Sequence, residues 1–412
     1  MTSLFDNTKV AIIGLGYVGL PLAVEFGKIM PTVGFDINKC RVNELKSGSD
    51  STLECTEEEL KEATFLTYTS ILDELKSANV YIVTVPTPID QHKQPDLTPL
   101  IKASEALGLI VSKGDVIIYE STVYPGATEE ACIPVVESVS GLTFNKDFFA
   151  GYSPERINPG DKEHRVTNIL KVTSGSNNEV AEFVDQLYKT IITAGTHKAS
   201  SIKVAEASKV IENVQRDVNI GLINELHQVF QKLGINTHEV VEAAATKWNF
   251  MKLKPGLVGG HCIGVDPYYL MQKSSESGYI PDLIRTAREI NDHMPSYLAN
   301  DFLHKLIQKM VNPIDCKVIL LGFTFKENCP DIRNTKVYDL YISMKNLGLQ
   351  VDIVDPWADP EEVNKEYGIS IKKSVDINNY NAAFLAVGHA ELIEICNQNK
   401  NIFIYDFKGL LD

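Results

Sequence analysis

The sequence has no paired-cysteine motif, although it contains seven cysteines. They stand at positions 40, 55, 132, 262, 316, 329 and 396, an odd and widely spaced set in which no two form a Cys-x-x-Cys pair. Disulfide frameworks and structural zinc sites rest on even numbers or close pairs of cysteines. We therefore expect a reduced, cytoplasmic protein without a metal site.

The sequence also lacks a long apolar run and an excess of basic residues. No apolar segment approaches the ~18 residues of a membrane span, and Met1 to Lys9 lack the basic-then-apolar pattern of a secretion signal. The formal net charge is -15, whereas nucleic acids and anionic membrane surfaces favour basic partners. We therefore expect neither membrane insertion nor nucleic-acid binding. The chain is long enough for two or three domains.

A glycine-rich turn stands between a predicted strand, 10–13, and a predicted helix, 20–28, and Asp36 follows a second strand. This order of strand, glycine turn, helix and later acid is the dinucleotide-binding fingerprint. The glycines allow a pyrophosphate to reach the helix N-terminus. The carboxylate accepts hydrogen bonds from the adenosine ribose and repels a 2′-phosphate. The alternative is a turn that binds nothing. We expect NAD as the cofactor, with contacts from Gly14, Gly16, Tyr17, Val18, Gly19, Asp36 and Arg41.

Further apolar runs at 81–85, 116–119, 148–152 and 169–172 predict strands that continue the sheet. Polar or proline-rich loops follow them, and ligands bind at the carboxyl ends of parallel strands. Thr122 and Glu155 are therefore site candidates, with a helix N-cap and a loop acid paired with Arg156 as the structural alternatives. The same loops add Pro86, Thr87, Ser121 and Thr122 to the expected cofactor contacts.

From about residue 201 to residue 233, apolar residues recur at spacings of three and four, without proline, until Gly234. This pattern predicts one helix about 50 Å long. Such a helix is too long for one Rossmann domain, so we expect it to join two domains and to pack its excess apolar surface against a second subunit. Lys209 and Asn213 share a face of it, as catalytic groups or as an ordinary exposed pair.

After Pro313 a second α/β unit begins, with predicted strands at 316–321, 350–354, 382–387 and 402–405 and a helix at 336–347. Further helices are predicted at 238–246 and 282–310. This half has no glycine fingerprint, so we expect a different nucleotide-like ligand there, contacted by Lys326 and Arg333.

The run Gly259-Gly260-His261-Cys262-Ile263-Gly264-Val265-Asp266 places a single thiol between glycines. Glycines allow unusual backbone angles and close approach of a ligand, so a nucleophile fits here. The alternative is a small buried apolar residue.

Together these residues resemble, over nearly the whole chain, the UDP-glucose/UDP-N-acetylhexosamine 6-dehydrogenases, NAD-dependent enzymes that oxidise a sugar C6 alcohol to a carboxylate in two hydride transfers. His261 and Val265, where the glucose enzymes carry Ser and Lys, resemble the acetamido-sugar branch that supplies capsule or O-antigen precursors, as does 216–219. The segment 255–258 favours UDP-GlcNAc or UDP-GalNAc. The matching motifs are 14–19, 85–88, 120–122, 153–155, Lys209 with Asn213, 259–266, and 322–326 with Asp331 and Arg333.

The resemblance implies an α/β fold of two Rossmann-like doubly wound domains joined by a long central helix and a helical dimerisation region. It implies an NAD-binding domain over 1–200, a central helical domain over 201–312 and a UDP-sugar-binding domain over 313–412, in a homodimer or a higher homo-oligomer.

The resemblance also implies roles for single residues. Cys262 is the nucleophile, Lys209 and Asn213 stabilise oxyanions, and Asp266, Glu155 and Thr122 organise water, with Glu155 as the general base. Arg333 is an implied cofactor contact and completes a site across a dimer interface. The implied substrate contacts are Glu155, Arg156, Lys209, Asn213, Arg216, Lys254, Gly259, His261, Phe325 and Lys326.

Other functions stay open. UDP-ManNAc or UDP-glucose is an alternative substrate. A β-hydroxyacid dehydrogenase shares the Rossmann domain, long helix and Lys/Asn pair but needs neither Cys262 nor residues 314–412. A nucleotide-sugar epimerase would release no net NADH, and a non-catalytic binding protein would not need Lys209, Asn213 or Cys262.

Overall fold

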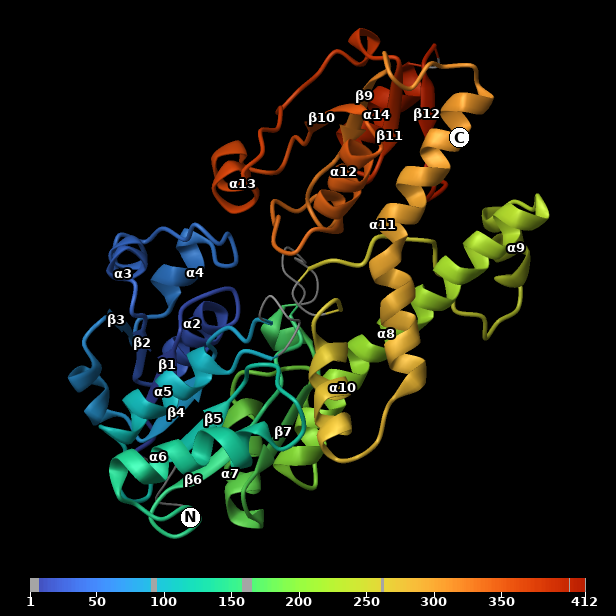
Figure 1. Ribbon diagram of the computed structural model, residues 1–412. Coiled ribbons are helices and arrows are strands. Elements are labelled where there is room, and N and C mark those ends of the chain that lie inside the picture. The colour runs from blue at the N-terminus through green and yellow to red at the C-terminus, as the bar shows by residue number, and fades with distance from the viewer. Residues whose placement is uncertain (1–6, 90–94, 158–164, 261–262, 400, 412) are drawn as a thin grey trace. The chain divides into compact units, whose positions relative to one another are not determined.

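The computed structural model describes residues 7–89, 95–157, 165–260, 263–399 and 401–411. The chain divides into two compact units, which are described separately (Figure 1). Unit 1 comprises the chain up to Glu212 together with Tyr268–Ser277, and unit 2 comprises Asn213–Pro267 together with Gly278–Asp412. Two helices belong in part to each unit, namely α8 (Ile202–Leu233) and α10 (Asp266–Glu276).

Unit 1 is built on an eight-stranded sheet with the order β3-β2-β1-β4-β5-β6-β7-β8. In this order, the strands from β3 through β1 to β6 are all parallel to one another. Strand β7 is antiparallel to β6, and β8 is parallel to β7. The order reverses beside β1, as in a doubly wound fold, so the loops after β1 and β4 lie at the switch point. The strands are β1 (Val10–Ile13), β2 (Thr32–Phe35), β3 (Leu66–Thr69), β4 (Val80–Val83), β5 (Val116–Tyr119), β6 (Phe149–Tyr152), β7 (Lys171–Gly175) and β8 (Thr196–Lys198).

Both faces of this sheet are buried at its centre, which explains why β1, β4 and β5 are continuous apolar runs. Ile13, Val83 and Tyr119 pack with α5 and α6 on one face, and Ile12 and Ile82 pack with α2 and α7 on the other. The site therefore has to lie at the strand ends. The helices are α2 (Gly19–Ile29), α3 (Lys39–Lys46), α4 (Glu57–Glu62), α5 (Thr98–Gly108), α6 (Ile133–Ser140) and α7 (Asn178–Lys189), with short turns η1 (Leu72–Ser77), η2 (Thr128–Cys132) and η3 (Val166–Asn168).

Unit 2 contains a four-stranded parallel sheet with the order β10-β9-β11-β12. Helices α11 and α12 cover one face, where the Phe302 and Phe384 rings meet edge to face with their centroids 5.5 Å apart, and α14 covers the other. The strands are β9 (Lys317–Leu321), β10 (Gln350–Val354), β11 (Ala382–Leu385) and β12 (Phe403–Tyr405). The helices are α9 (Thr237–Ala244), α11 (Asp282–Gln308), α12 (Lys336–Asn346), α13 (Pro360–Tyr367) and α14 (Ala390–Gln398), with the short turn η4 (Ile377–Asn379).

The predicted α/β class with a long central helix is confirmed. Strands β1, β2, β5 and β10 have the predicted bounds, whereas β3, β8 and α10 were not predicted, and the parallel continuation ends at β7. Within the described ranges, no helix is long and apolar enough to cross a membrane. The same ranges contain no cluster of three metal-binding side chains.

Helix α8 buries polar side chains as well as apolar ones. Val210 and Val214 are buried, and Leu222, Val229 and Leu233 are exposed in the single chain. The buried polar residues recur at intervals of three, four or seven, so they lie along one face. We call this set the polar stripe: Glu206, Lys209, Asn213, Asp217, Asn224 and His227.

Within unit 2, Asp217 of the polar stripe fixes α11 against α8. The fully buried Asp217 carboxylate accepts hydrogen bonds from the Arg288 guanidinium and, at 2.8 Å, from the Asn291 amide. Arg288 is 2% exposed, so neither charge has water to replace its partner.

We expect Arg288→Met to lower the free energy of unfolding by about 3 kcal/mol, because it leaves a buried carboxylate without its cation. Arg285→Met is the matched control on the same helix, since Arg285 forms exposed pairs with Asp282 and Glu289. It should leave the free energy of unfolding nearly unchanged, because exposed ion pairs contribute little. Urea denaturation of both variants checks this, and equal losses would contradict it.

Candidate active site

The glycine turn of unit 1 is closed against the protein at its ends and open in its middle. Gly14 has a φ of +95°, and a Cβ on Gly19 would lie 1.9 Å from the Gly14 carbonyl oxygen. At Gly16 a Cβ would meet nothing within 4 Å. Thr84 at the end of β4 donates to the Gly14 carbonyl at 2.8 Å and fixes the turn. A ligand can therefore approach the backbone at Gly16.

The surroundings of this turn suit an anionic dinucleotide. Helix α2 has no side-chain cap and no acidic residue in its first turn, so its N-terminal N–H groups are suited to a pyrophosphate. Asp36 follows β2, and its carboxylate accepts from the N–H of Leu15 at 2.9 Å and of Asn38 at 2.8 Å. These bonds hold the carboxylate beside the turn. The residues fit NAD, which accepts a hydride when bound.

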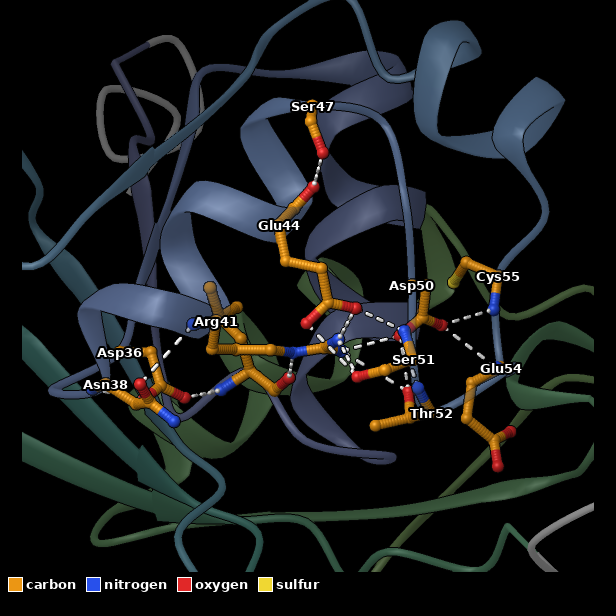
Figure 2. A network of polar contacts seen from close by, with 11 residues as sticks. Asp36, Asn38, Arg41, Glu44, Ser47, Asp50, Ser51, Thr52, Glu54 and Cys55 are labelled. Carbon is orange, nitrogen blue, oxygen red and sulfur yellow. Dashed lines mark hydrogen bonds and ion pairs between the residues drawn. The ribbon is translucent and has the colours of Figure 1, made fainter.

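Arg41 on α3 is directed at protein acceptors (Figure 2). Its Nε donates to the Leu15 carbonyl at 2.9 Å, inside the glycine turn. Its two terminal nitrogens pair with Glu44 at 3.0 Å and Asp50 at 2.7 Å, and they also donate to Ser51 and Thr52. Arg41 therefore links the cofactor turn to the loop that follows α3.

Asp50 organises that loop from its centre (Figure 2). One carboxylate oxygen accepts from Thr52 and Arg41, and the other accepts from the N–H groups of Glu54 and Cys55, each at 3.0 Å. Burial alone would raise the pKa of Asp50, but these hydrogen bonds outweigh it and hold the pKa below its usual value. The charged carboxylate is thus the form that orders the loop.

The loops after β4 and β5 are bonded to each other at the carboxyl edge of the sheet. Thr87 Oγ1 donates to the Thr122 carbonyl at 2.7 Å, and Ser121 Oγ donates to the Val85 carbonyl. No helix of the described chain begins at Thr122, so the N-cap alternative does not account for it. Pro86 lies exposed in the first of these loops.

Glu155, after β6, is a buried carboxyl among charged groups of unit 1. It is 6% exposed, and burial raises its pKa to about 7, although the ammonium groups of Lys209 and Lys171 act in the opposite direction. A carboxyl with this pKa can exchange a proton near neutral pH. Arg156 does not serve as its partner, because Arg156 pairs with Glu212 and donates to the Leu170 carbonyl at 2.9 Å.

In unit 2, Asn213 of the polar stripe donates to the Asp266 carboxylate at 2.6 Å. Asp266 is 2% exposed and is the first residue of α10, so the bond joins α8 to the end of the predicted cysteine loop. Arg216 lies on the exposed side of α8. Cys262 and His261 lie outside the described residues.

The loop over 252–260 is fixed within unit 2 by its backbone. The Asn224 side chain donates to the Gly256 carbonyl at 3.0 Å and accepts from the Gly256 N–H at 2.9 Å. Lys254 Nζ donates to the Gly409 carbonyl at 3.1 Å. At the end of this loop, a Cβ on Gly260 would lie 2.8 Å from the Phe325 ring.

The segment with Phe325 and Lys326 follows β9 and is supported by two buried side chains. Asp355 accepts from the N–H of Thr324 at 3.0 Å, and His389 contacts both Asp355 and Thr324 at 3.0 Å. Burial alone would raise the pKa of Asp355, but hydrogen bonds, first from His389, hold it at about 2. Further along, Arg333 forms a two-point pair with Asp331 at 2.6 and 2.9 Å.

The sequence interpretation missed the supporting carboxylates. Asp50, Glu206 and Asp355 are all buried and accept backbone N–H groups of loops next to the predicted contacts. Asp355 carried a usable signal, since it directly follows a predicted strand. Asp50 and Glu206 carried none, because neither follows a predicted strand.

Three domain models of the UDP-glucose/GDP-mannose dehydrogenase family match consecutive parts of the chain. These are the NAD binding domain over residues 8–192, the central domain over 203–293 and the UDP binding domain over 319–412. The chain belongs to this family of NAD-dependent oxidoreductases, which confirms the expected cofactor and enzyme class.

Individual relatives match nearly end to end. The chain is 58% identical to a UDP-N-acetyl-D-glucosamine 6-dehydrogenase of Pseudomonas aeruginosa, over 98% of each chain. It is 55% identical to the enzyme of that name from Salmonella typhi, over 98% of this chain and 97% of the relative. The solved structure of a UDP-D-ManNAc dehydrogenase from Pyrococcus horikoshii has a TM-score of 0.88 at 28% identity, over 98% of this chain and 96% of that one.

We expect Asp50→Asn to raise the KM for NAD about tenfold, equivalent to about 1.4 kcal/mol. The amide cannot pair with the Arg41 charge, and its NH₂ group would face a backbone donor. Asp73→Asn, which removes an exposed partner of Lys76, is the control and should leave the KM unchanged. Steady-state kinetics with varied NAD checks this. An unchanged KM in Asp50→Asn would show that the network does not support the cofactor turn.

Proposed function

We propose that the protein is a cytoplasmic, homodimeric UDP-N-acetylglucosamine 6-dehydrogenase that makes a uronic acid precursor for a surface polysaccharide. The supporting observation is the identity of 58% and 55%, along nearly the whole chain, to enzymes of that name, against 28% to a UDP-D-ManNAc dehydrogenase of known structure. UDP-GalNAc is the second candidate substrate, since the segment 255–258 resembles that of enzymes acting on either of these two sugars.

The reaction is a four-electron oxidation in two stages. The C6 alcohol first loses a hydride and a proton and becomes an aldehyde. The Cys262 thiolate then adds to the aldehyde carbon, which makes a tetrahedral thiohemiacetal that can lose a second hydride and become a thioester. Water replaces the sulfur, so that the carboxylate leaves and the thiolate is restored. Two NAD are reduced for each sugar.

The polar stripe supplies the groups that stabilise charge in this reaction. The Lys209 ammonium and the Asn213 amide stabilise the alkoxide and the later tetrahedral oxyanions. The Asn213–Asp266 hydrogen bond supports this role, because it orients the amide from one side. Glu155 acts as the base that takes a proton from the hydrolytic water, with Thr122 and Asp266 ordering that water.

The two ligands are held by different parts of the chain. The glycine turn, Asp36 and the loops with Thr87 and Ser121 hold NAD. The UDP-sugar is held through Phe325, Lys326 and the backbone of the 252–260 loop, and further through Glu155, Arg156, Arg216, Lys254 and His261. Arg333 is assigned to a site shared between subunits. The three predicted domains, 1–200, 201–312 and 313–412, correspond to these roles.

We expect the purified protein to produce about two NADH per UDP-GlcNAc consumed, because a second hydride leaves from the thiohemiacetal. UDP-GalNAc, UDP-ManNAc and UDP-glucose are compared in the same assay. Cys262→Ala should fail to complete turnover, whereas Cys40→Ala, at an exposed thiol, should behave as the parent. One NADH per sugar would favour a single-step dehydrogenase, and none would favour an epimerase.

We expect kcat at saturating substrates to rise with pH, to be half-maximal near pH 7 and to level off above that pH. The pKa of Glu155 is raised to about 7, so the carboxylate that serves as base forms only as the pH passes that value. Glu155→Gln should lower kcat by about 10² to 10⁴ and remove this rise. A Gln variant that kept both the rate and the rise would assign the base to another group.

A further inference from the structure

Asn334 binds both backbone polar groups of Gly260, which lies in the run 259–266 that carries Cys262. The Gly260 N–H donates to the Asn334 carbonyl oxygen at 3.2 Å. In return the Asn334 side-chain Nδ2 donates to the Gly260 carbonyl oxygen at 3.0 Å. One residue therefore fixes the backbone of Gly260 within unit 2, through both its N–H and its carbonyl group.

Glycine is required on the other side of this contact. A Cβ on Gly259 would lie 2.5 Å from the Asn334 carbonyl oxygen, and a Cβ on Gly260 would lie 2.8 Å from the Phe325 ring. Gly260 also has a φ of +80°, which disfavours any side chain. These two glycines thus allow the loop to approach the protein's own chain, in addition to any ligand.

Asn334 also lies beside the far end of the same loop. Its Nδ2 would be 3.4 Å from a Cβ built on Gly264, so the amide stands between Gly260 and Gly264. Asn334 has a φ of +51° and is exposed. Asn tolerates this backbone region better than most residues, and an exposed side chain contributes little to the core.

We infer that Asn334 is a positioning residue, which fixes the chain at Gly260 and lies beside Gly264, so that the Cys262 thiol captures the aldehyde before it leaves. This inference rests on the proposed function, since it needs a two-stage reaction. Asn334 thereby couples the first oxidation, which forms the aldehyde, to the second, which forms the thioester. The first oxidation needs no thiol and should proceed without it.

The test compares Asn334→Asp and Asn334→Gly with the parent, using UDP-GlcNAc and saturating NAD. Both substitutions tolerate the positive φ, but neither side chain can donate to the Gly260 carbonyl. We expect the yield to fall from about two NADH per sugar toward one, and kcat to fall about tenfold or more. The UDP-sugar aldehyde should be released into solution, where mass spectrometry detects it. The KM for NAD should change less than about twofold, because the glycine turn is not involved.

Asn145→Asp is the matched control. Asn145 is exposed, has a φ of 59° and donates to the backbone carbonyl of Ser176, but it belongs to unit 1. It should keep the parent's yield. A full yield of two NADH without free aldehyde in both Asn334 variants would overturn the inference, as would an equal loss of both oxidations. A parent that itself yields fewer than two NADH would instead refute the proposed function.

Discussion

The burial of polar side chains along α8 is the constraint on which the rest of the structure depends. A buried donor or acceptor without a partner costs more than a hydrogen bond contributes, so each member of the polar stripe must find one. In unit 1, Glu206 accepts from the N–H of Thr128 at 2.9 Å and fixes the loop after β5. In unit 2, Asn213, Asp217 and Asn224 fix the start of α10, helix α11 and the 252–260 loop.

This arrangement explains how a reaction with several charged states can be held in place. A helix is rigid, so amide and ammonium groups presented from it need little rearrangement when charge develops on a substrate. The loops that meet it are fixed by hydrogen bonds to their backbone, as at Gly256 and Gly260. The side chains of these loops can then serve the reaction, because hydrogen-bond partners elsewhere in the chain set the shape of the loop backbone.

Much of the fold could be predicted because burial on both faces leaves a plain pattern. Strands β1, β2 and β5 are runs of apolar residues, whereas β3 (Leu66–Thr69) mixes polar and apolar residues and was missed. The length of α8 was also predictable, but its buried face was not: Leu222 and Val229 suggest an apolar stripe, and the buried one is partly polar. The site residues next to strand ends could be found in the sequence. The hydrogen bonds that Asp50 and Asn334 form with backbone groups could not, since a bond to a backbone group does not depend on the partner's side chain.

The most direct measurement of the central claim is the mass of the enzyme stopped in turnover. The Glu155→Gln variant, quenched with acid while it oxidises UDP-GlcNAc, should carry the UDP-N-acetylglucosaminuronyl group as a thioester, and peptide mapping should place it on Cys262. This result would join the substrate, the nucleophile and the base in one observation. An enzyme that turns over without any covalent adduct, or with an adduct on another residue, would contradict the account.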